Sequence, residues 1–316
     1  MEKVEILMNW SCNENCIFCS VADNFDSGDV KPWSEVKEVI DDAAGEADMI
    51  SISGGDPTIR KDIFRTVEYA KDQGFDKIEI QSNGMMFSKE DFLDRLLDLG
   101  VTRILVSIHS HDPDTHDFLT RVDGSWERTV EGLENIAERD VELRYSTVVN
   151  EYNYRELKEL AEFLHERFGL VFSFHFNYIM PQGNAEESFA SLAPKLTEAK
   201  PYLEEAVEYL RERDQRPWLH NVYPCIMRDE QYEAYMTEII LTETNLYGPD
   251  FECEIDERRH SFRKKPDSCQ NCRYNDICVG PPRKYLEVFG EDEFEPVEGP
   301  KKSRNDIKSQ DYSSRG

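Results

Sequence analysis

The chain has 316 residues, of which 39% are hydrophobic and 32% are charged. This is enough apolar material for about two domains of ~150 residues each. No run of ~18 uninterrupted apolar residues occurs, so a membrane protein is excluded. The 37 basic and 65 acidic residues give a net charge of −28, which would repel phosphate backbones and argues against a nucleic-acid partner. The N-terminus lacks the apolar stretch of a secretory signal, so we expect a cytoplasmic protein.

Between residues 4 and 177, short strand-like segments alternate with amphipathic helical segments. We predict strands at 4–10, 49–53, 77–81, 103–109, 142–149 and 171–177, and helices at 34–45, 61–74, 89–100, 126–139 and 154–169. Strands that alternate with helices predict a parallel sheet with right-handed crossovers.

The strands themselves alternate between apolar and polar residues. Ile50 and Ile52 would face one side of the sheet, whereas Ser51 and Ser53 would face the other. Strands covered by helices on both faces usually read as continuous apolar runs instead. The pattern therefore favours a curled sheet with helices outside, a polar lumen, and chemistry at the carboxyl ends of the strands. An open doubly wound sheet is the alternative.

The eight cysteines fall into two groups, and the first group directly follows the first strand. Cys12, Cys16 and Cys19 lie within eight residues of each other. In a reducing compartment, clustered thiols favour metal sites over disulfides. Three thiolates can hold an iron–sulfur cluster and leave one iron open. A structural zinc site normally needs four ligands, and no fourth cysteine lies nearby, which favours the cluster.

This first motif resembles the CxxxCxxC motif of the radical S-adenosylmethionine (SAM) enzymes. Three further segments occur in the order found in that family, namely Gly54-Gly55-Asp56-Pro57, Ser82-Asn83-Gly84 and Ser107-Ile108-His109. The first of them is similar to the GGEP motif of the family, with the shorter Asp56 in place of glutamate. The resemblance covers about residues 4–180. It implies a partial (β/α)6 barrel similar to a TIM barrel, with a [4Fe-4S] cluster and bound SAM.

The resemblance also implies a reaction. The open iron would chelate the amino and carboxylate groups of SAM. One electron from the reduced cluster would then cleave the sulfonium to methionine and a 5′-deoxyadenosyl radical, which takes a hydrogen atom from the substrate. The task of the protein is to bind, to orient and to exclude side reactions.

On the same resemblance, specific residues are expected to contact SAM. Gly54 and Gly55 would allow the backbone close to the methionine part, Phe18 would touch the adenine, and Ser107 and His109 would reach the ribose. A guanidinium suits a carboxylate, so Arg144 or else Ser146 is expected at the carboxylate of SAM. The full expected set of SAM-binding residues is Phe18, Gly54, Gly55, Asp56, Asn83, Ser107, His109, Arg144, Ser146, Ile179 and Met180.

The second group of cysteines lies between residues 225 and 278. Cys269, Cys272 and Cys278 form a CxxCx5C motif, with Cys225 and Cys253 upstream. The spacing permits zinc or an iron–sulfur cluster. After a radical SAM barrel, the motif resembles the twitch and SPASM extensions, which carry auxiliary [4Fe-4S] clusters. Five cysteines suffice for one cluster, as in the twitch form. We predict Cys225, Cys269, Cys272 and Cys278 as its ligands, with Cys253 as the rival to Cys225.

The chain is expected to divide into a barrel at 1–185, a linking helix at 186–215, a small iron–sulfur domain at 216–298 and a disordered tail at 299–316. Because regular alternation of strand and helix stops after Asn177, the barrel is expected to end near residue 185. The tail is rich in Lys, Ser and Asp and has few apolar residues, which is typical of disorder.

These features predict a radical SAM enzyme that acts on a peptide or protein, or alternatively on a small molecule. A non-catalytic iron–sulfur or zinc protein for electron transfer or scaffolding is a third reading, against which the polar lumen and the Gly54–Pro57 motif argue. A ferredoxin or flavodoxin is expected as electron donor. The N-terminus enters the barrel directly, so no leader-binding domain is expected before it. His175, Asn177 and Tyr178 are candidate lumen residues without an assigned role.

Overall fold

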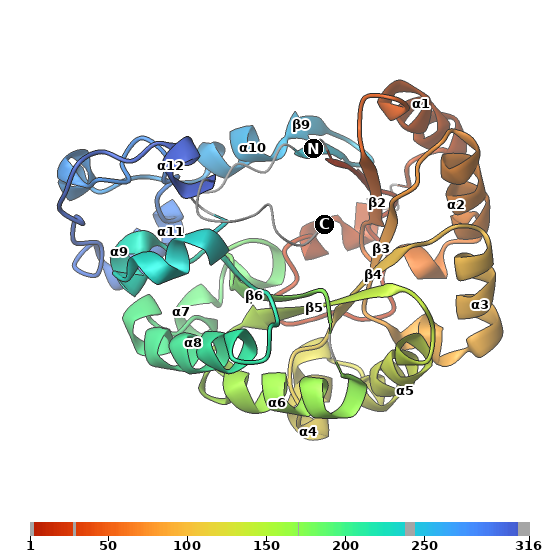
Figure 1. The fold of residues 1–316 in the computed structure, drawn as a ribbon, viewed down its shortest axis with the longest axis horizontal. Coiled ribbons are helices and arrows are strands. Elements are labelled where there is room, and N and C mark those ends of the chain that lie inside the picture. The colour runs from red at the N-terminus through yellow and green to blue at the C-terminus, as the bar shows by residue number, and fades with distance from the viewer. Residues whose placement is uncertain (1–2, 28–29, 170, 238–243, 309–316) are drawn as a thin grey trace.

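The computed structural model describes residues 3–27, 30–169, 171–237 and 244–308 (Figure 1). Its centre is a nine-stranded sheet in the order β7-β6-β5-β4-β3-β2-β1-β8-β9. Neighbouring strands are parallel throughout except for the antiparallel pair β8–β9. Nowhere in these ranges does a helix have both the length and the apolar character needed to cross a membrane.

The strands and helices have the following bounds. The strands are β1 (Lys3–Leu7), β2 (Met49–Ser53), β3 (Ile78–Ser82), β4 (Arg103–Ser107), β5 (Glu142–Val149), β6 (Ser173–Tyr178), β7 (Pro217–His220), β8 (Thr244–Tyr247) and β9 (Glu252–Glu254). The α-helices are α1 (Trp33–Ala43), α2 (Ile63–Asp72), α3 (Glu90–Asp98), α4 (Pro113–Thr120), α5 (Ser125–Ala137), α6 (Leu157–Phe168), α7 (Phe189–Leu192), α8 (Leu196–Arg211), α9 (Pro224–Met227), α10 (Ile255–Ser261), α11 (Arg283–Phe289) and α12 (Arg304–Lys308). Short 3-10 helices lie between them, of which η2 (Pro57–Ile59), η6 (Glu230–Tyr235) and η7 (Asp267–Asn271) matter below.

The helices α1, α2, α3, α5, α6 and α8 lie on the outside of the curled sheet (Figure 1). Each presents one apolar face to the strands. In α2, for example, Ile63, Val67 and Ala70 are fully buried, and their spacing of four and three residues places them on a single helix face. The fold is the expected partial, TIM-like barrel.

Along β5, buried and partly exposed residues alternate without a break. Tyr145 on the outer face is fully buried, whereas Ser146 on the inner face is partly exposed. Because side chains of a strand point alternately to its two faces, the apolar set meets the helices and the polar set lines the lumen. The alternation of apolar and polar residues predicted from the sequence therefore matches the outer and inner faces of the barrel sheet.

The sheet extends beyond residue 185, where we expected the barrel to end. β7 pairs in parallel with β6, and β8 pairs in parallel with β1. The expected linking helix, α8, therefore leads directly into another strand of the same sheet. β7 has only four residues and begins with Pro217, so it lacks the length that makes a strand visible in a sequence.

Two further expectations are corrected by the structure. The sixth strand begins at Ser173 rather than 171, and Phe172 is 44% exposed. The tail, expected to be disordered from residue 299, contains α12, in which Ile307 is 1% exposed. Lys302 pairs with the buried carboxylate of Glu233 at 2.5 Å, which explains why this segment packs. Residues 309–316 lie outside the described part of the chain.

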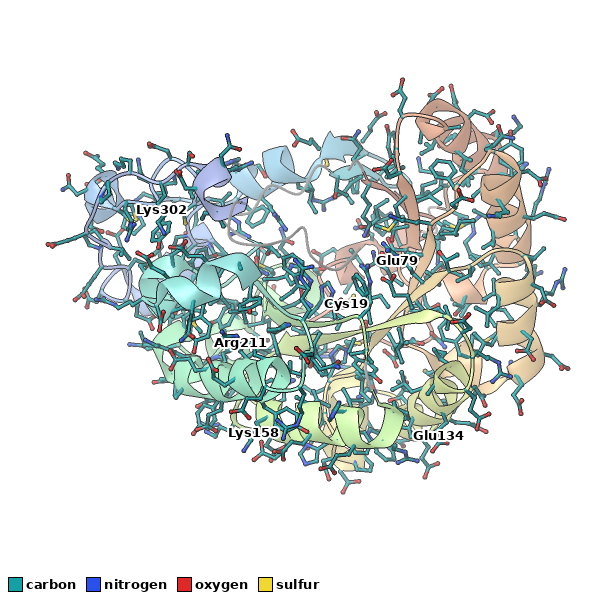
Figure 2. All side chains as sticks on the ribbon, viewed as in Figure 1. Cys19, Glu79, Glu134, Lys158, Arg211 and Lys302 are labelled. Carbon is teal, nitrogen blue, oxygen red and sulfur yellow. The ribbon has the colours of Figure 1, made fainter. Side chains whose placement is uncertain are left out.

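A buried ion network closes the lumen at the amino ends of the strands. Glu79 is 1% exposed and lies between Lys3 Nζ at 3.0 Å and Arg144 Nη1 at 3.1 Å. Ser51 Oγ donates a further hydrogen bond to Glu79 at 2.8 Å. Figure 2 shows Glu79 inside the ring of helices, whereas Glu134 lies at its rim. We call Lys3, Glu79 and Arg144 the floor network.

We predict that Glu79→Ala destabilises the fold by about 3–5 kcal/mol, because it leaves two largely buried cations without their shared anion. The matched control is Glu134→Ala, which removes a surface pair with Arg167 and should cost about 0–1 kcal/mol. Urea unfolding measures both. Equal costs for the two variants would contradict a structural role for the floor network.

The same network predicts a pH dependence. Burial alone would raise the pKa of Glu79, but Lys3 and Arg144 outweigh it and lower the pKa to about 2. A carboxylate whose pKa is lower in the folded state stabilises the fold above its unfolded pKa of about 4.3. This contribution should be lost as the pH falls from there towards 2.

Candidate functional site

A cavity of about 250 Å³ opens at the carboxyl ends of the central strands. Cys19, which lies on its wall, is near the middle of the molecule in Figure 2. The cavity is lined by nine of the residues expected to hold the cluster or SAM, namely Cys12, Cys16, Phe18, Cys19, Gly54, Gly55, Asn83, Ser107 and His109. Residues that are up to 97 positions apart in the chain thus meet at one place, as 109 − 12 = 97.

The cysteine loop is held by the end of α4. The N–H groups of Asn15 and Ile17 donate to the carbonyls of Thr120 and Leu119 at 3.1 and 2.9 Å. Burial raises the pKa of the Cys12, Cys16 and Cys19 thiols. Because metals bind thiolates, an iron cluster would overcome this burial penalty by replacing the protons.

The donor set fits a multi-iron cluster better than a single ion. In the part of the chain that the structure describes, no three His, Cys, Asp or Glu side chains are arranged to hold one metal ion. A zinc ion would need its thiolates at about 2.3 Å, whereas an iron–sulfur cluster spreads its thiolates over several irons. Three thiols on one wall suit such a cluster.

Gly54 and Gly55 bring the loop after β2 against the cysteine loop. Gly55 N donates to Asn9 O at 2.7 Å, and Asp56 N donates to Ser11 O at 2.9 Å. A Cβ on Gly54, where φ is +141°, would lie 2.5 Å from Asn9 O. A Cβ on Gly55 would overlap the carbonyl oxygens of Trp10 and Ser11. Only glycine permits this backbone contact.

Asp56 lies behind the cavity and is fully buried. Its carboxylate accepts hydrogen bonds from Thr58 N at 2.8 Å, from the Thr58 hydroxyl, from Ser82 Oγ at 2.8 Å and from Asn83 N at 3.0 Å. Burial raises the pKa of Asp56. The carboxylate is thus occupied by the protein, and it ties the loop after β2 to the loop after β3.

His109 presents a neutral imidazole to the cavity. Burial lowers the pKa of His109 well below its usual value. Its Nδ1 accepts from Val148 N at 3.2 Å, so the proton of the neutral ring is on Nε2, which can donate. The ring also stands edge-on to Phe18 with the centroids 4.7 Å apart. This pair gives the cavity one apolar wall and one donor.

Besides Asp56, four further residues of the expected SAM-binding set do not line the cavity. Arg144 belongs to the floor network, and it lies four residues before Val148 on the same strand, or about 13 Å below the cavity wall. Ser146 Oγ accepts from Asn177 Nδ2 at 2.9 Å. Ile179 is 1% exposed, and its N–H donates to Val149 O. Met180 O accepts from Gln182 N at 2.9 Å.

The cavity also contains residues that we did not expect. Glu14 is 6% exposed and accepts from Cys16 Sγ at 3.4 Å, and burial raises the pKa of Glu14 to about 8. Gln81 and Val148 complete the wall from β3 and β5. Gln81 occupies a polar position of its strand, so the alternation of the strand could have predicted that it faces the lumen. Val148 is apolar, and nothing in the sequence indicates that it lines the cavity.

A second, smaller cavity gathers the downstream cysteines. Cys225, Cys269, Cys272 and Cys278 all line it. Burial raises the pKa of the Cys225 thiol, and the proximity of Cys278, Cys269 and Cys272 raises it further. Cys253 lies instead in β9, opposite Leu246, and is not part of this wall. The placement supports Cys225 as the fourth ligand over Cys253.

The comparison with known protein families decides the class of the chain. Residues 11–164 match the model of the Radical SAM superfamily. This stretch, 154 of the 316 residues, is a Radical SAM domain. Radical SAM enzymes bind a [4Fe-4S] cluster and SAM, and the match covers the three cysteines and both glycines of the first cavity.

Relatives and solved structures extend the comparison. AdoMet-dependent heme synthase of Methanosarcina barkeri is 32% identical over 180 residues, which are 56% of this chain and 50% of that protein. A probable GTP 3′,8-cyclase of Saccharolobus solfataricus is 25% identical over 254 residues, or 78% of each protein. Streptococcus suis SuiB bound to S-adenosylmethionine superposes with a TM-score of 0.65 at 16% identity, covering 93% of this chain and 76% of SuiB. The chain spans about half the length of the heme synthases that it matches.

We predict that Gly55→Ala abolishes assembly of the first cluster, because the added methyl group overlaps two carbonyl oxygens beside Cys12. Gly45→Ala is the control: φ there is +80° with no atom within 4 Å of the added Cβ, so it should cost about 1–2 kcal/mol of stability and leave iron unchanged. Iron per chain after anaerobic reconstitution is the measurement. Full iron in Gly55→Ala would contradict the close approach.

We predict that Cys225→Ala lowers the iron bound per chain by about half, because it removes one of four ligands of a second four-iron cluster. Cys253→Ala is the matched thiol control and should retain all iron and acid-labile sulfide. The reverse pattern would assign Cys253 as the ligand, and no loss in either variant would remove the second cluster.

Proposed function

We propose that this chain reductively cleaves SAM and abstracts a hydrogen atom from a bound substrate. The observation that carries this proposal is the single cavity at the carboxyl ends of the strands, in which three thiols, two obligatory glycines and a neutral histidine meet. A bare electron-transfer protein would need the thiols but not the rest of this wall.

When bound, the cluster supplies one electron that splits SAM into methionine and a 5′-deoxyadenosyl radical. The chain does the positioning. Gly54 and Gly55 let the loop after β2 pack against the cysteine loop, beside which the methionine part would lie, and the apolar ring of Phe18 suits the adenine. His109 Nε2–H offers a donor for a ribose hydroxyl. The radical takes a hydrogen atom from the substrate, so that 5′-deoxyadenosine and a substrate radical result.

We further propose that Cys225, Cys269, Cys272 and Cys278 hold an auxiliary [4Fe-4S] cluster. Four thiolates complete the ligands of such a cluster and leave no open iron for a substrate. Held by these four cysteines, such a cluster would supply an acceptor for the one electron that the substrate radical loses on forming a closed-shell product, while the proton lost with it would pass to water.

The charges of the lumen favour a neutral substrate, and we propose a peptide or protein segment. On the polar face of the described strands, Lys3 and Arg144 pair with Glu79, and Arg103 pairs with Glu142 at 3.0 Å. No Lys or Arg among the described residues lines the first cavity. A triphosphate or a polycarboxylate would find no counter-charge there, whereas a peptide backbone needs only hydrogen-bonding groups.

A small-molecule substrate is the second candidate. It is favoured by the names of the sequence relatives, which include heme synthases and probable GTP cyclases. Either substrate needs a low-potential electron donor, for which we propose a ferredoxin or flavodoxin. The eight cysteines are all free thiols, which fits a reducing, cytoplasmic setting.

We predict that the reconstituted protein, given SAM and dithionite without oxygen, releases 5′-deoxyadenosine, and that Cys16→Ala reduces the release to background. Chromatography of the nucleoside measures it. Cys253→Ala should release as much as the wild type. Release from Cys16→Ala as well would place the cleavage elsewhere.

The same assay separates the substrate classes. Added peptides with deuterium at carbon should transfer it to 5′-deoxyadenosine, whereas GTP should leave the rate unchanged. A wild type that binds iron and SAM fully but releases no nucleoside, even with peptides or GTP present, would favour a protein that only binds SAM.

A further inference from the structure

Arg263, just after α10, is a buried cation beside the second cysteine cavity, and it is only 5% exposed. Its Nη1 donates to Tyr223 Oη at 3.0 Å and to Gly280 O at 3.1 Å. Its Nη2 donates to Asn221 Oδ1 at 2.6 Å. One guanidinium therefore joins two segments of the chain, residues 221–223 and the turn at Gly280.

Both segments lead to proposed ligands of the auxiliary cluster. Tyr223 directly precedes Pro224 and Cys225 at the start of α9. Gly280 follows Cys278 by two residues, and its N–H donates to Cys278 Sγ at 3.4 Å. Arg263 thus holds the Cys225 and Cys278 segments together.

The segment that contains Asn221 and Tyr223 also begins at the barrel. Asn221 follows the last residue of β7, and its Nδ2 donates to Tyr178 O at the end of β6, at 3.0 Å. The preceding residue, His220, lies on the inner side of the sheet, with its Nε2 3.0 Å from His175 Nδ1. The bridge from Arg263 therefore reaches the carboxyl ends of two strands, next to the lumen.

The backbone around Gly280 is fixed by the strand segment that carries Arg263. Lys264 N donates to Pro281 O at 2.9 Å, and Arg263 forms an antiparallel bridge with Pro282. Gly280 has a φ of +78°, and a Cβ there would lie 2.8 Å from Lys265 Cγ. Glycine is required for this turn, which aims its N–H at the sulfur of Cys278.

The potential of an iron–sulfur cluster depends on nearby charge, on hydrogen bonds to its sulfurs and on exposure to solvent. A buried cation and an N–H···S bond both stabilise the reduced cluster, which carries one more negative charge. We propose that Arg263 is a positioning residue that fixes the auxiliary cluster against the lumen and raises its reduction potential. This inference rests on the auxiliary cluster of the proposed function, and it assigns the cluster the role of electron acceptor.

A second arginine beside the same cavity provides the matched control. Arg273 directly follows Cys272, and its Nη1 pairs with Glu230 at 2.5 Å. Within the described part of the chain, the hydrogen bond of its side chain goes to Glu230 and not to the backbone of a cysteine segment. Replacing Arg273 removes the same charge from the neighbourhood while leaving the bridge between the segments and the barrel intact.

The test is a redox titration of the full chain, followed by electron paramagnetic resonance. The background variant Cys16→Ala disables the first cluster, so that the remaining signal belongs to the auxiliary one. Arg263→Gln in this background should lower the equilibrium constant for one-electron reduction at least tenfold, which corresponds to 59 mV. Arg263→Lys keeps the positive charge but cannot make all the hydrogen bonds of the guanidinium. Its equilibrium constant for reduction should lie between those of the Cys16→Ala parent and Arg263→Gln. Arg273→Gln should shift the constant less than Arg263→Gln.

The outcomes separate the inference from the proposed function. If the Cys16→Ala parent binds no iron, the auxiliary cluster and the inference fall together. An intact cluster whose potential is the same in Arg263→Gln and its parent overturns only the role of Arg263. If Arg263→Gln cannot hold iron, the test uses the reduction potential of Arg263→Lys instead. A potential below that of the Cys16→Ala parent supports the inference, and a potential equal to that of the parent overturns it.

Discussion

The candidate site depends on one backbone contact, in which residues 9–11 pack directly against residues 54–56. Two hydrogen bonds of 2.7 and 2.9 Å join the loops, and the space beside Gly54 and Gly55 is filled by carbonyl oxygens. The contact places Cys12 over the strand ends. Asp56 then carries the connection to Asn83 after the third strand. The cysteine loop and both glycine-containing loops therefore form one preorganised unit, as a site for an exposed reactive cofactor requires.

The chain carries a large net negative charge, whereas the charged side chains of the floor network inside the barrel are paired with one another. The net charge is −28, yet the floor network balances Glu79 between two cations at 3.0 and 3.1 Å. Low dielectric makes an unpaired charge costly there, so the lumen is polar without being strongly charged.

The sequence predicts what is local and fails where distant segments meet. Strand alternation and the spacing of Cys12, Cys16 and Cys19 are local, and they sufficed for the barrel and the family. β7 and β8 are four residues each and become strands only by pairing with β6 and β1, which no local pattern reveals. Arg144 was expected at the carboxylate of SAM because a guanidinium pairs well with a carboxylate. The register of the strands instead places its side chain next to Glu79. The choice of Cys225 over Cys253 likewise needs the cavity in three dimensions.

The barrel and the second cysteine region are joined on two sides, which limits how they can move against each other. Arg263 bonds to Asn221 at the end of β7. Tyr285 in α11 accepts from Leu196 N at the start of α8 at 2.9 Å, and its hydroxyl donates to Glu293. The Tyr285 tether is buried and the Arg263 side chain is 5% exposed, so breaking either tether would leave a buried polar group without this partner. Because β7 is itself a strand of the barrel sheet, the second region is an extension of the barrel. The separation between the two cysteine cavities is therefore set by the fold of the barrel sheet and its extension.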